Sequence, residues 1–364
     1  MKLDDGSALG EMSCFPDDVI VHILTHLPVK GLLRARAVCK HWYSLTTDHH
    51  FFRLYNRNCF VNPQVLVELY DSMKPNIGLV CVDHVLGVSE LDWNFIKERV
   101  KIRATCNGLI CCSTVPEKDM YFICNPITRV WKLIPRSRER PASRFYPNGE
   151  ATLVGLAYDA FSEYYTLVLA GYHRSFGHKA DGTFVCFVFN SSNNTWRKFI
   201  TFQEESFSHI NRNQVVYVHR TLHWLTSNSS HVLALDLEYD LWKKITLPDE
   251  IGSVGNRAYL LEKDGDLSVV QISESFMKIW VMRDYNFGIW TVEDVISLKC
   301  IKGMAPGVFP ICLTSEAILF ATHKQVLVYY RRSRSWKEMF SVMNYSLPLW
   351  FAAHSFKCTI ASCL

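Results

Sequence analysis

The chain has 364 residues, of which 49% are hydrophobic, 20% charged and 13% aromatic. This length leaves room for two domains or one large repeat array, and the composition excludes disordered, collagen-like and coiled-coil classes. The net charge of +4 comes from 39 basic and 35 acidic residues scattered along the chain, which gives no support for a dedicated nucleic-acid-binding domain.

The N-terminus and the 13 cysteines bear on location and cofactors. Residues 1–12 are predicted to be a flexible N-terminus without an apolar signal core, so we expect a nuclear or cytoplasmic protein with reduced thiols. No Cys-x-x-Cys pair occurs, so no metal site is predicted, and no motif indicates another cofactor. Because no apolar run approaches the ~18 residues that span a membrane, no membrane contact is expected.

Residues 15–52 are predicted to form three short helices. The Phe-Pro-Asp-Asp sequence at residues 15–18 is typical of a helix start, since proline fits the first turn and acidic residues favour the positive end of the helix dipole. Apolar residues then recur at helical spacing up to Pro28 and again through residues 32–45. A unit of this size is near the lower limit for folding alone. It is therefore either a helical cap on the larger domain or a docking module for a partner helix.

The order of residues 15–42 resembles the F-box motif, with Pro-x-Asp, Ile-Leu, Leu-Pro and Val-Cys-Lys-x-Trp in succession. The resemblance implies an F-box at residues 13–57, which binds a Skp-type adaptor that bridges to a cullin–RING ubiquitin ligase. Residues implied in this interface, some of them shared with the core of the unit, are Phe15, Pro16, Ile20, Leu24, Leu27, Pro28, Leu32, Val38, Cys39 and Trp42. Four basic residues would suit an acidic adaptor or form an ordinary solvated face: Lys30, Arg34, Arg36 and Lys40.

After residue 100 the chain is made of short β-type runs that repeat. Five times, a strand ends at Asn, Asp or Tyr and a tryptophan follows six positions later, which is typical of a hairpin. These tryptophans are Trp131, Trp196, Trp242, Trp290 and Trp336. Their spacings of 65, 46, 48 and 46 residues are close to the periods of four-stranded propeller blades. We therefore predict that each tryptophan packs between neighbouring blades.

The sequence thus predicts a mainly β protein with an N-terminal three-helix unit. Residues 58–364 are expected to form a propeller of about six blades, although five or seven also fit and a two-sheet sandwich is the alternative. Residues 347–360 would supply a strand that closes the ring with N-terminal strands. An insertion at residues 135–149 accounts for the long first spacing and is predicted to be an extended loop on one rim.

This β region resembles the kelch-type or F-box-associated region of plant F-box proteins. The matching segments are residues 106–111, 125–131, 222–224 and 235–236, whereas the double glycine of kelch repeats is absent, so the F-box-associated label fits better. The resemblance implies a kelch-like β-propeller that binds a target protein for ubiquitination. It further implies that the chain is a non-catalytic, substrate-recognition subunit of an SCF (Skp–cullin–F-box) E3 ubiquitin ligase.

No catalytic motif supports an enzyme, since glycine-rich nucleotide loops and the usual hydrolase signatures are missing. Two alternatives remain, a propeller that receives a small molecule in its central channel and an F-box scaffold that acts without the ligase. A basic run is a candidate target-binding loop, although its first interpretation is a solvated loop: Arg136, Arg138, Arg140 and Arg144. If it binds the target, the target presents acidic or phosphorylated residues.

Overall fold

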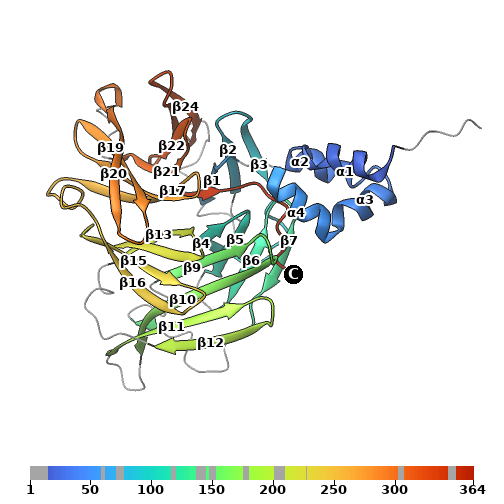
Figure 1. The fold of residues 1–364 in the computed structure, drawn as a ribbon, viewed down its shortest axis with the longest axis horizontal. Coiled ribbons are helices and arrows are strands. Elements are labelled where there is room, and N and C mark those ends of the chain that lie inside the picture. Colours follow the sequence, from blue (N-terminus) through green and yellow to red (C-terminus); the bar gives the residue numbers. More distant parts are fainter. Residues whose placement is uncertain are drawn as a thin grey trace, which may run out of the picture. The chain divides into compact units, whose positions relative to one another are not determined.

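The structure is a computed structural model that describes residues 15–58, 62–70, 78–115, 120–136, 145–146, 153–174, 180–200, 210–226, 228–301, 307–342 and 350–364. The chain divides into two compact units, Met1–Phe60 and Val61–Leu364, and each is described by itself (Figure 1). No helix within the described ranges is both long and apolar enough to cross a membrane.

The described part of the first unit, residues 15–58, contains four helices where three were predicted. They are α1 (Asp17–Thr25), α2 (Val29–Ala35), α3 (Lys40–Thr47) and α4 (His49–Asn58). The difference arises at Asp48, whose extended backbone ends α3. The Asp48 carboxylate accepts the backbone N–H of His50 at 3.0 Å and so caps α4. A segment that interrupts the apolar pattern in the sequence is therefore a helix start.

The core of the helical unit joins α4 to the other helices. Leu24, Leu32, Phe51 and Tyr55 have almost no exposed surface. The Tyr55 hydroxyl donates to the carbonyl of Leu27 at 2.9 Å, which satisfies a backbone group just beyond α1. α4 thus completes a small interior.

The second unit contains six antiparallel sheets, which confirms the predicted six-bladed propeller. Blade 1 holds β25 (Trp350–Phe356), β1 (Gln64–Tyr70), β2 (Gly78–Asp83) and β3 (Gly87–Leu91). Blade 2 holds β4 (Val100–Cys106), β5 (Leu109–Thr114), β6 (Tyr121–Asn125) and β7 (Val130–Leu133). Blade 3 holds β9 (Leu153–Asp159), β10 (Tyr164–Arg174), β11 (Ala180–Asn190) and β12 (Thr195–Ile200), with β8 (Phe145–Tyr146) also paired to β10.

The remaining blades are regular four-stranded meanders. Blade 4 holds β13 (Ile210–Val218), β14 (Thr221–Thr226), β15 (His231–Asp236) and β16 (Leu241–Thr246). Blade 5 holds β17 (Arg257–Lys263), β18 (Asp266–Ile272), β19 (Phe276–Asp284) and β20 (Ile289–Ser297). The short helix η2 (Lys299–Ile301) leads to blade 6, with β21 (Phe309–Leu313), β22 (Ala317–Ala321), β23 (Gln325–Tyr330) and β24 (Ser335–Ser341).

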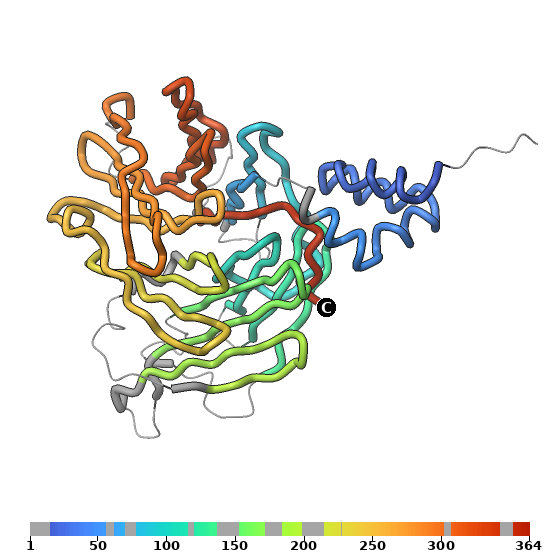
Figure 2. The backbone as a smooth tube through the Cα atoms, viewed as in Figure 1, coloured from blue at the N-terminus to red at the C-terminus, as the bar shows by residue number. Residues whose placement is uncertain are grey.

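The ring is closed by strands from both ends of this unit, as predicted for residues 347–360. β25 pairs with β1 in antiparallel register, with Val67 opposite Ala353. Figure 2 shows this C-terminal strand in red beside the strands of blade 1. Since β25 is the first strand of blade 1, the blade cannot be completed until the C-terminal part of the chain is in place.

Residues 357–364, here called the C-terminal clasp, continue from β25 onto blades 2 and 3. The Asn125 amide donates to the carbonyls of Thr359 and Ala361 at 3.0 and 2.9 Å. The Thr359 hydroxyl donates to the carbonyl of Asn107 at 2.6 Å, and the Tyr165 hydroxyl donates to that of Cys363 at 3.3 Å. The clasp therefore ties three consecutive blades together.

Each of the five predicted tryptophans is the second residue of the outermost strand of its blade. Trp196 donates its ring N–H to the carbonyl of Pro135 at 2.6 Å, and Trp290 donates to that of Thr246 at 3.2 Å. Both carbonyls belong to the preceding blade or to the segment that follows it. Trp131 differs, because 43% of its surface is exposed. The position of the tryptophan in its strand is therefore the same in all five blades, whereas the exposure of its side chain differs between blades.

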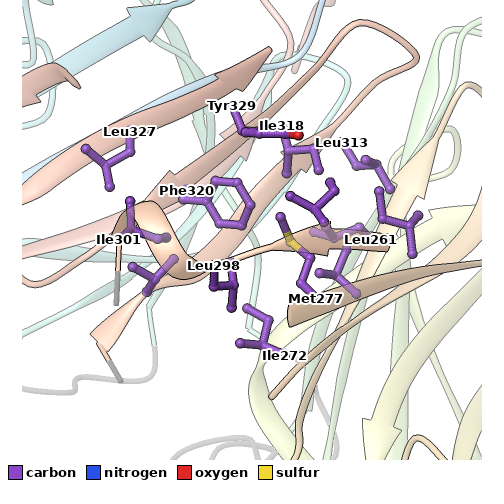
Figure 3. Close-up of a cluster of buried hydrophobic side chains, with 14 of the residues drawn as sticks. Leu261, Ile272, Met277, Leu298, Ile301, Leu313, Ile318, Phe320, Leu327 and Tyr329 are labelled. Atoms are coloured by element: carbon purple, nitrogen blue, oxygen red, sulfur yellow. The ribbon is translucent and has the colours of Figure 1, made fainter. Parts of the chain in front are cut away.

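The hydrophobic core of the propeller lies between adjacent blades. Figure 3 shows the cluster between blades 5 and 6, where Met277, Ile318 and Phe320 have no exposed surface. Comparable buried clusters join blades 1 and 6, 4 and 5, 1 and 2, and 3 and 4. Blades 1, 4, 5 and 6 are thus each packed on both sides, and blades 2 and 3 each share such a cluster with one neighbour.

Candidate functional site

The helical unit carries an exposed apolar row on the outer side of α1. Phe15, Val19 and Ile23 are 69%, 40% and 52% exposed and follow one another at intervals of four residues. Val19 and Ile23 lie four residues apart in α1 and therefore share one face of the helix, whereas Phe15 lies two residues before the helix begins. Val38 and Tyr43 add exposed apolar surface beyond α1. The unit therefore offers apolar surface that its own core does not use.

The structure divides the ten residues implied in adaptor binding into three groups. Five are exposed: Phe15, Pro16, Pro28, Val38 and Cys39. Three are half-buried, namely Ile20, Leu27 and Trp42, and two are buried, namely Leu24 and Leu32. The buried pair belongs to the interior of the unit. Sequence reasoning did not name Val19, Ile23 or Tyr43 for the interface, although the four-residue spacing of Val19 and Ile23 indicates that these two share a helix face.

Polar contacts hold the row in place. The ring of His41 in α3 meets the carboxylate of Asp17 at the start of α1, with 2.7 Å between Nε2 and Oδ1. Arg36 donates to the carbonyl of Thr46 at 2.7 Å, and burial lowers the pKa of its guanidinium. Arg36 is thus part of the internal framework. The other predicted basic residues are exposed and face solvent: Lys30, Arg34 and Lys40.

In the propeller, one end of the blades carries the turns between the first and second strands and between the third and fourth strands. We call this end the turn face. Several of its turns follow an Asn or Asp whose side chain accepts the backbone N–H two residues ahead, as Asp236 does from Glu238 at 2.8 Å. Large apolar side chains stand exposed at several tips: Val85, Leu86, Phe161, Tyr239 and Phe287. The turn face is therefore a rigid frame with apolar tips.

A cavity of about 600 Å³ opens among the innermost strands β4, β13, β17, β21 and β25. Lys357 and Glu262 form an ion pair within its lining, with 2.8 Å between Nζ and Oε2. Burial raises the pKa of the Cys106 and Cys312 thiols to about 12, so neither is a thiolate at neutral pH. The charged groups of the cavity thus neutralise each other, and its thiols are not nucleophiles.

Outside this cavity, the described residues give little support for a metal site or a reactive thiol. Within the described ranges, no group of three or more His, Cys, Asp or Glu side chains is placed to hold a metal ion. The described cysteines are free thiols. Burial also raises the pKa of the adjacent thiols of Cys111 and Cys112 well above its usual value.

The basic run is only partly visible. Arg136 is exposed, whereas Arg138, Arg140 and Arg144 lie outside the described residues. Part of the insertion predicted as an extended loop is a short strand, because Tyr146 in β8 pairs with Tyr172 in β10.

Comparison with known proteins matches both units. A family model described as the F-box domain matches residues 12–54, and one described as the F-box associated beta propeller domain matches residues 81–347. F-box protein At5g49610 of Arabidopsis thaliana is 55% identical over 354 residues, which cover 96% of this chain and 98% of that protein. F-box protein CPR1 of Arabidopsis thaliana is 24% identical over 334 residues, which cover 82% of this chain and 78% of that protein.

Proposed function

This chain belongs to the plant-type F-box proteins with an F-box-associated β-propeller, and on that premise we propose that it is the substrate-recognition subunit of an SCF E3 ubiquitin ligase. F-box domains generally bind Skp-type adaptors in SCF complexes, and proteins with an F-box and a propeller generally serve as adaptor or receptor subunits rather than as catalysts. We propose the nucleus or the cytoplasm as its location.

The observation that carries this proposal is the exposed apolar row Phe15, Val19 and Ile23. Val19 and Ile23 lie on α1, whose neighbouring face already fills the core through Leu24, and Phe15 lies just before the helix begins. An apolar stripe on a small helical unit is a typical docking surface for a partner helix. In this proposal the row contacts the Skp-type adaptor, while exposed basic residues such as Lys30 and Arg34 favour an acidic adaptor.

The propeller would hold the target protein close to the ubiquitin-charged enzyme of the ligase. A six-bladed ring closed by β25 and the C-terminal clasp is a rigid support. Rigid positioning raises the effective concentration of target lysines near the reacting thioester, so the chain can promote ubiquitination without supplying a catalytic residue.

Substitution of Ile23 in the full chain tests the docking role. Ile23→Asp places a charge in the exposed row, and we expect at least about 30-fold weaker binding to a Skp-type adaptor because interface hot spots contribute about 2 kcal/mol or more. Leu24 is a poor choice for this test, because its side chain is buried and its loss would damage the unit itself.

The matched control is Val254→Asp, which adds the same charge at a fully exposed valine of the propeller. It should leave adaptor binding unchanged. Thermal unfolding of both variants should match the parent, since both sites are exposed. Undiminished adaptor binding by Ile23→Asp would show that the row is not the docking surface.

Experiments can distinguish the proposed function from two others, a small-molecule receptor and a scaffold that acts without the ligase. The cavity is within the usual size range of small-molecule sites, which favours a receptor role as the second candidate. A receptor without a ligase role would not bind the adaptor. A ligase-independent scaffold would leave target turnover in cells the same with and without residues 1–50, whereas the proposed function requires turnover to fall when they are removed.

A further inference from the structure

The outer strands of the blades differ in one respect that bears on partner binding. In four of the five strands that carry the repeated tryptophan, a basic residue follows it: Lys132, Arg197, Lys243 and Lys337. In β20 of blade 5 the next two residues are Thr291 and Val292, and both are exposed. Charged side chains on an edge strand protect it against pairing with another chain. Among these five strands, β20 is the one in which no charged residue directly follows the tryptophan, and its first charged side chain is that of Glu293.

Apolar side chains are exposed along the same edge. Phe287 in the turn before β20, together with Ile289, Val292 and Val295 on the strand, is between 44% and 81% exposed. An edge strand also presents backbone N–H and C=O groups on its unpaired side. β20 therefore combines an open hydrogen-bonding edge with an apolar surface, which is the combination that binds an added strand.

The open edge ends at Val295. Its N–H donates to the Asp294 carboxylate at 2.9 Å, and its carbonyl accepts from the Arg334 guanidinium at 3.4 Å. These contacts cover the backbone groups of Val295 on the side away from β19. A segment that pairs with β20 would therefore lie along Ile289–Val292 and meet Arg334 at its end.

This end of the edge carries positive charge. A β-bulge in β20 places Glu293 beside Arg331 and Lys263, at 2.8 and 3.1 Å. Although burial opposes it, hydrogen bonds from Arg331 and Lys263 hold the pKa of the Glu293 carboxyl below its usual range. The whole network contains four cations and three anions: Lys263, Arg283, Arg331, Arg334, Asp264, Glu293 and Asp294. Arg332, which follows Arg331 in the chain, is exposed and adds a further cation, so the balance favours a carboxylate on the partner.

We propose that the edge of β20 receives an extended segment of the target protein, which adds a fifth strand to blade 5. Its apolar side chains lie against Phe287, Ile289 and Val292, and an Asp or Glu at one end lies beside Arg332 and Arg334. This assignment rests on the proposed function, because it gives the edge to the target rather than to the adaptor.

A peptide selection with the full chain tests the proposal and does not require the target to be identified first. A displayed library of random peptides of about 12 residues, long enough to form an added strand, is selected against the protein. Enriched peptides should carry alternating apolar residues and an acidic residue at one end. Thr291→Lys with Val292→Lys should weaken their binding at least tenfold, and Arg332→Glu with Arg334→Glu should weaken it severalfold.

The matched control is Leu133→Lys with Leu241→Lys, which adds the same two charges at exposed leucines of other outer strands and should leave peptide binding unchanged. Lysine is already present at equivalent positions in other blades, so the β20 variant should fold, and thermal unfolding checks this. Failure to enrich peptides, or equal binding by the β20 lysine variant, would overturn the proposal. Adaptor binding by the same variants reports separately on the proposed function, since the β20 substitutions leave the helical unit intact.

Discussion

The helical unit and the propeller use their apolar residues in different ways. In the helical unit, Leu24 and Phe51 fill a small interior while Phe15 and Ile23 remain exposed on the outer row. In the propeller, buried apolar clusters join neighbouring sheets at five junctions of the ring. Under the proposed docking role, the apolar exposure on the helices serves a partner, whereas apolar residues of the blades serve mainly the fold.

The two units differ in this way because the helical unit is small and the propeller is a closed ring. A unit of fewer than about 60 residues buries a smaller fraction of its surface than a large domain does. A closed ring gives every sheet two neighbours, so its apolar faces need no further partner. The turn tips and the edge of β20 are places where apolar side chains of the propeller gather at the surface, and there the propeller resembles the helical unit.

The largest expected effect comes from Phe320, which is fully buried between blades 5 and 6 and stacks near Trp336. Phe320→Ala should lower the free energy of unfolding of the propeller by about 3–5 kcal/mol, because it leaves a cavity in a closed core. Hydrogen exchange followed by mass spectrometry should show lost protection across the blades and unchanged protection in α1–α4. An equal loss of hydrogen-exchange protection in the helices would mean that the two units unfold together and are not independently stable.

A smaller effect is expected at Gly108, where the C-terminal clasp crosses blade 2. Gly108 has φ of +85°, and an added Cβ would lie 2.9 Å from the carbonyl oxygen of Lys357 and closer still to Thr359. Gly108→Ala should therefore cost about 2–3 kcal/mol in denaturant unfolding, through backbone strain and lost clasp hydrogen bonds. Gly265→Ala is the control, since Gly265 has φ of +94° with open space around it. Equal costs for the two variants would show that the clasp adds no stability.

A pH effect of about 2 kcal/mol is expected from His223, which is fully buried in β14. Its Nδ1 lies 3.2 Å from the carbonyl of Val216 and its Nε2 lies 2.8 Å from the hydroxyl of Tyr285. Burial lowers the pKa of His223 to about 4.

An unfolded histidine titrates near pH ~6.5, so between about pH 6.5 and 4 the unfolded state binds the additional proton. Stability from neutral His223 is complete above the unfolded pKa and is lost as the pH falls. The unfolding free energy of the propeller should drop by about 2 kcal/mol between about pH 7.5 and about pH 5. His223→Gln should flatten this slope even if it lowers stability at neutral pH. An unchanged slope would assign the pH dependence to other groups.

The sequence allowed much of the propeller to be predicted, because its signals are local and repeated. The six-position interval from Asn, Asp or Tyr to tryptophan reflects one hairpin geometry, so Trp196 and Trp290 identify outer strands reliably. Burial depends on neighbours that are distant in sequence, so the exposure of Trp131 could not be foreseen. In the helices, α1 is apolar on two sides, and spacing alone does not tell that Leu24 faces inward and Ile23 outward.

The smallest effect concerns the repeated tryptophans and sharpens the comparison within the propeller itself. Trp290 donates its ring N–H to the carbonyl of Thr246 in blade 4, whereas Trp131 is 43% exposed. Trp290→Phe removes that hydrogen bond and should lower the unfolding free energy by about 1 kcal/mol, while Trp131→Phe should change it by less than about 0.5 kcal/mol. Equal effects would mean that the tryptophans act only as apolar filler. A larger effect at Trp290 would show that the tryptophans also join neighbouring blades by hydrogen bonds. Among the described residues, the exposed apolar row of the helical unit has no such polar contact to a neighbour of its own chain and depends on a partner to cover it.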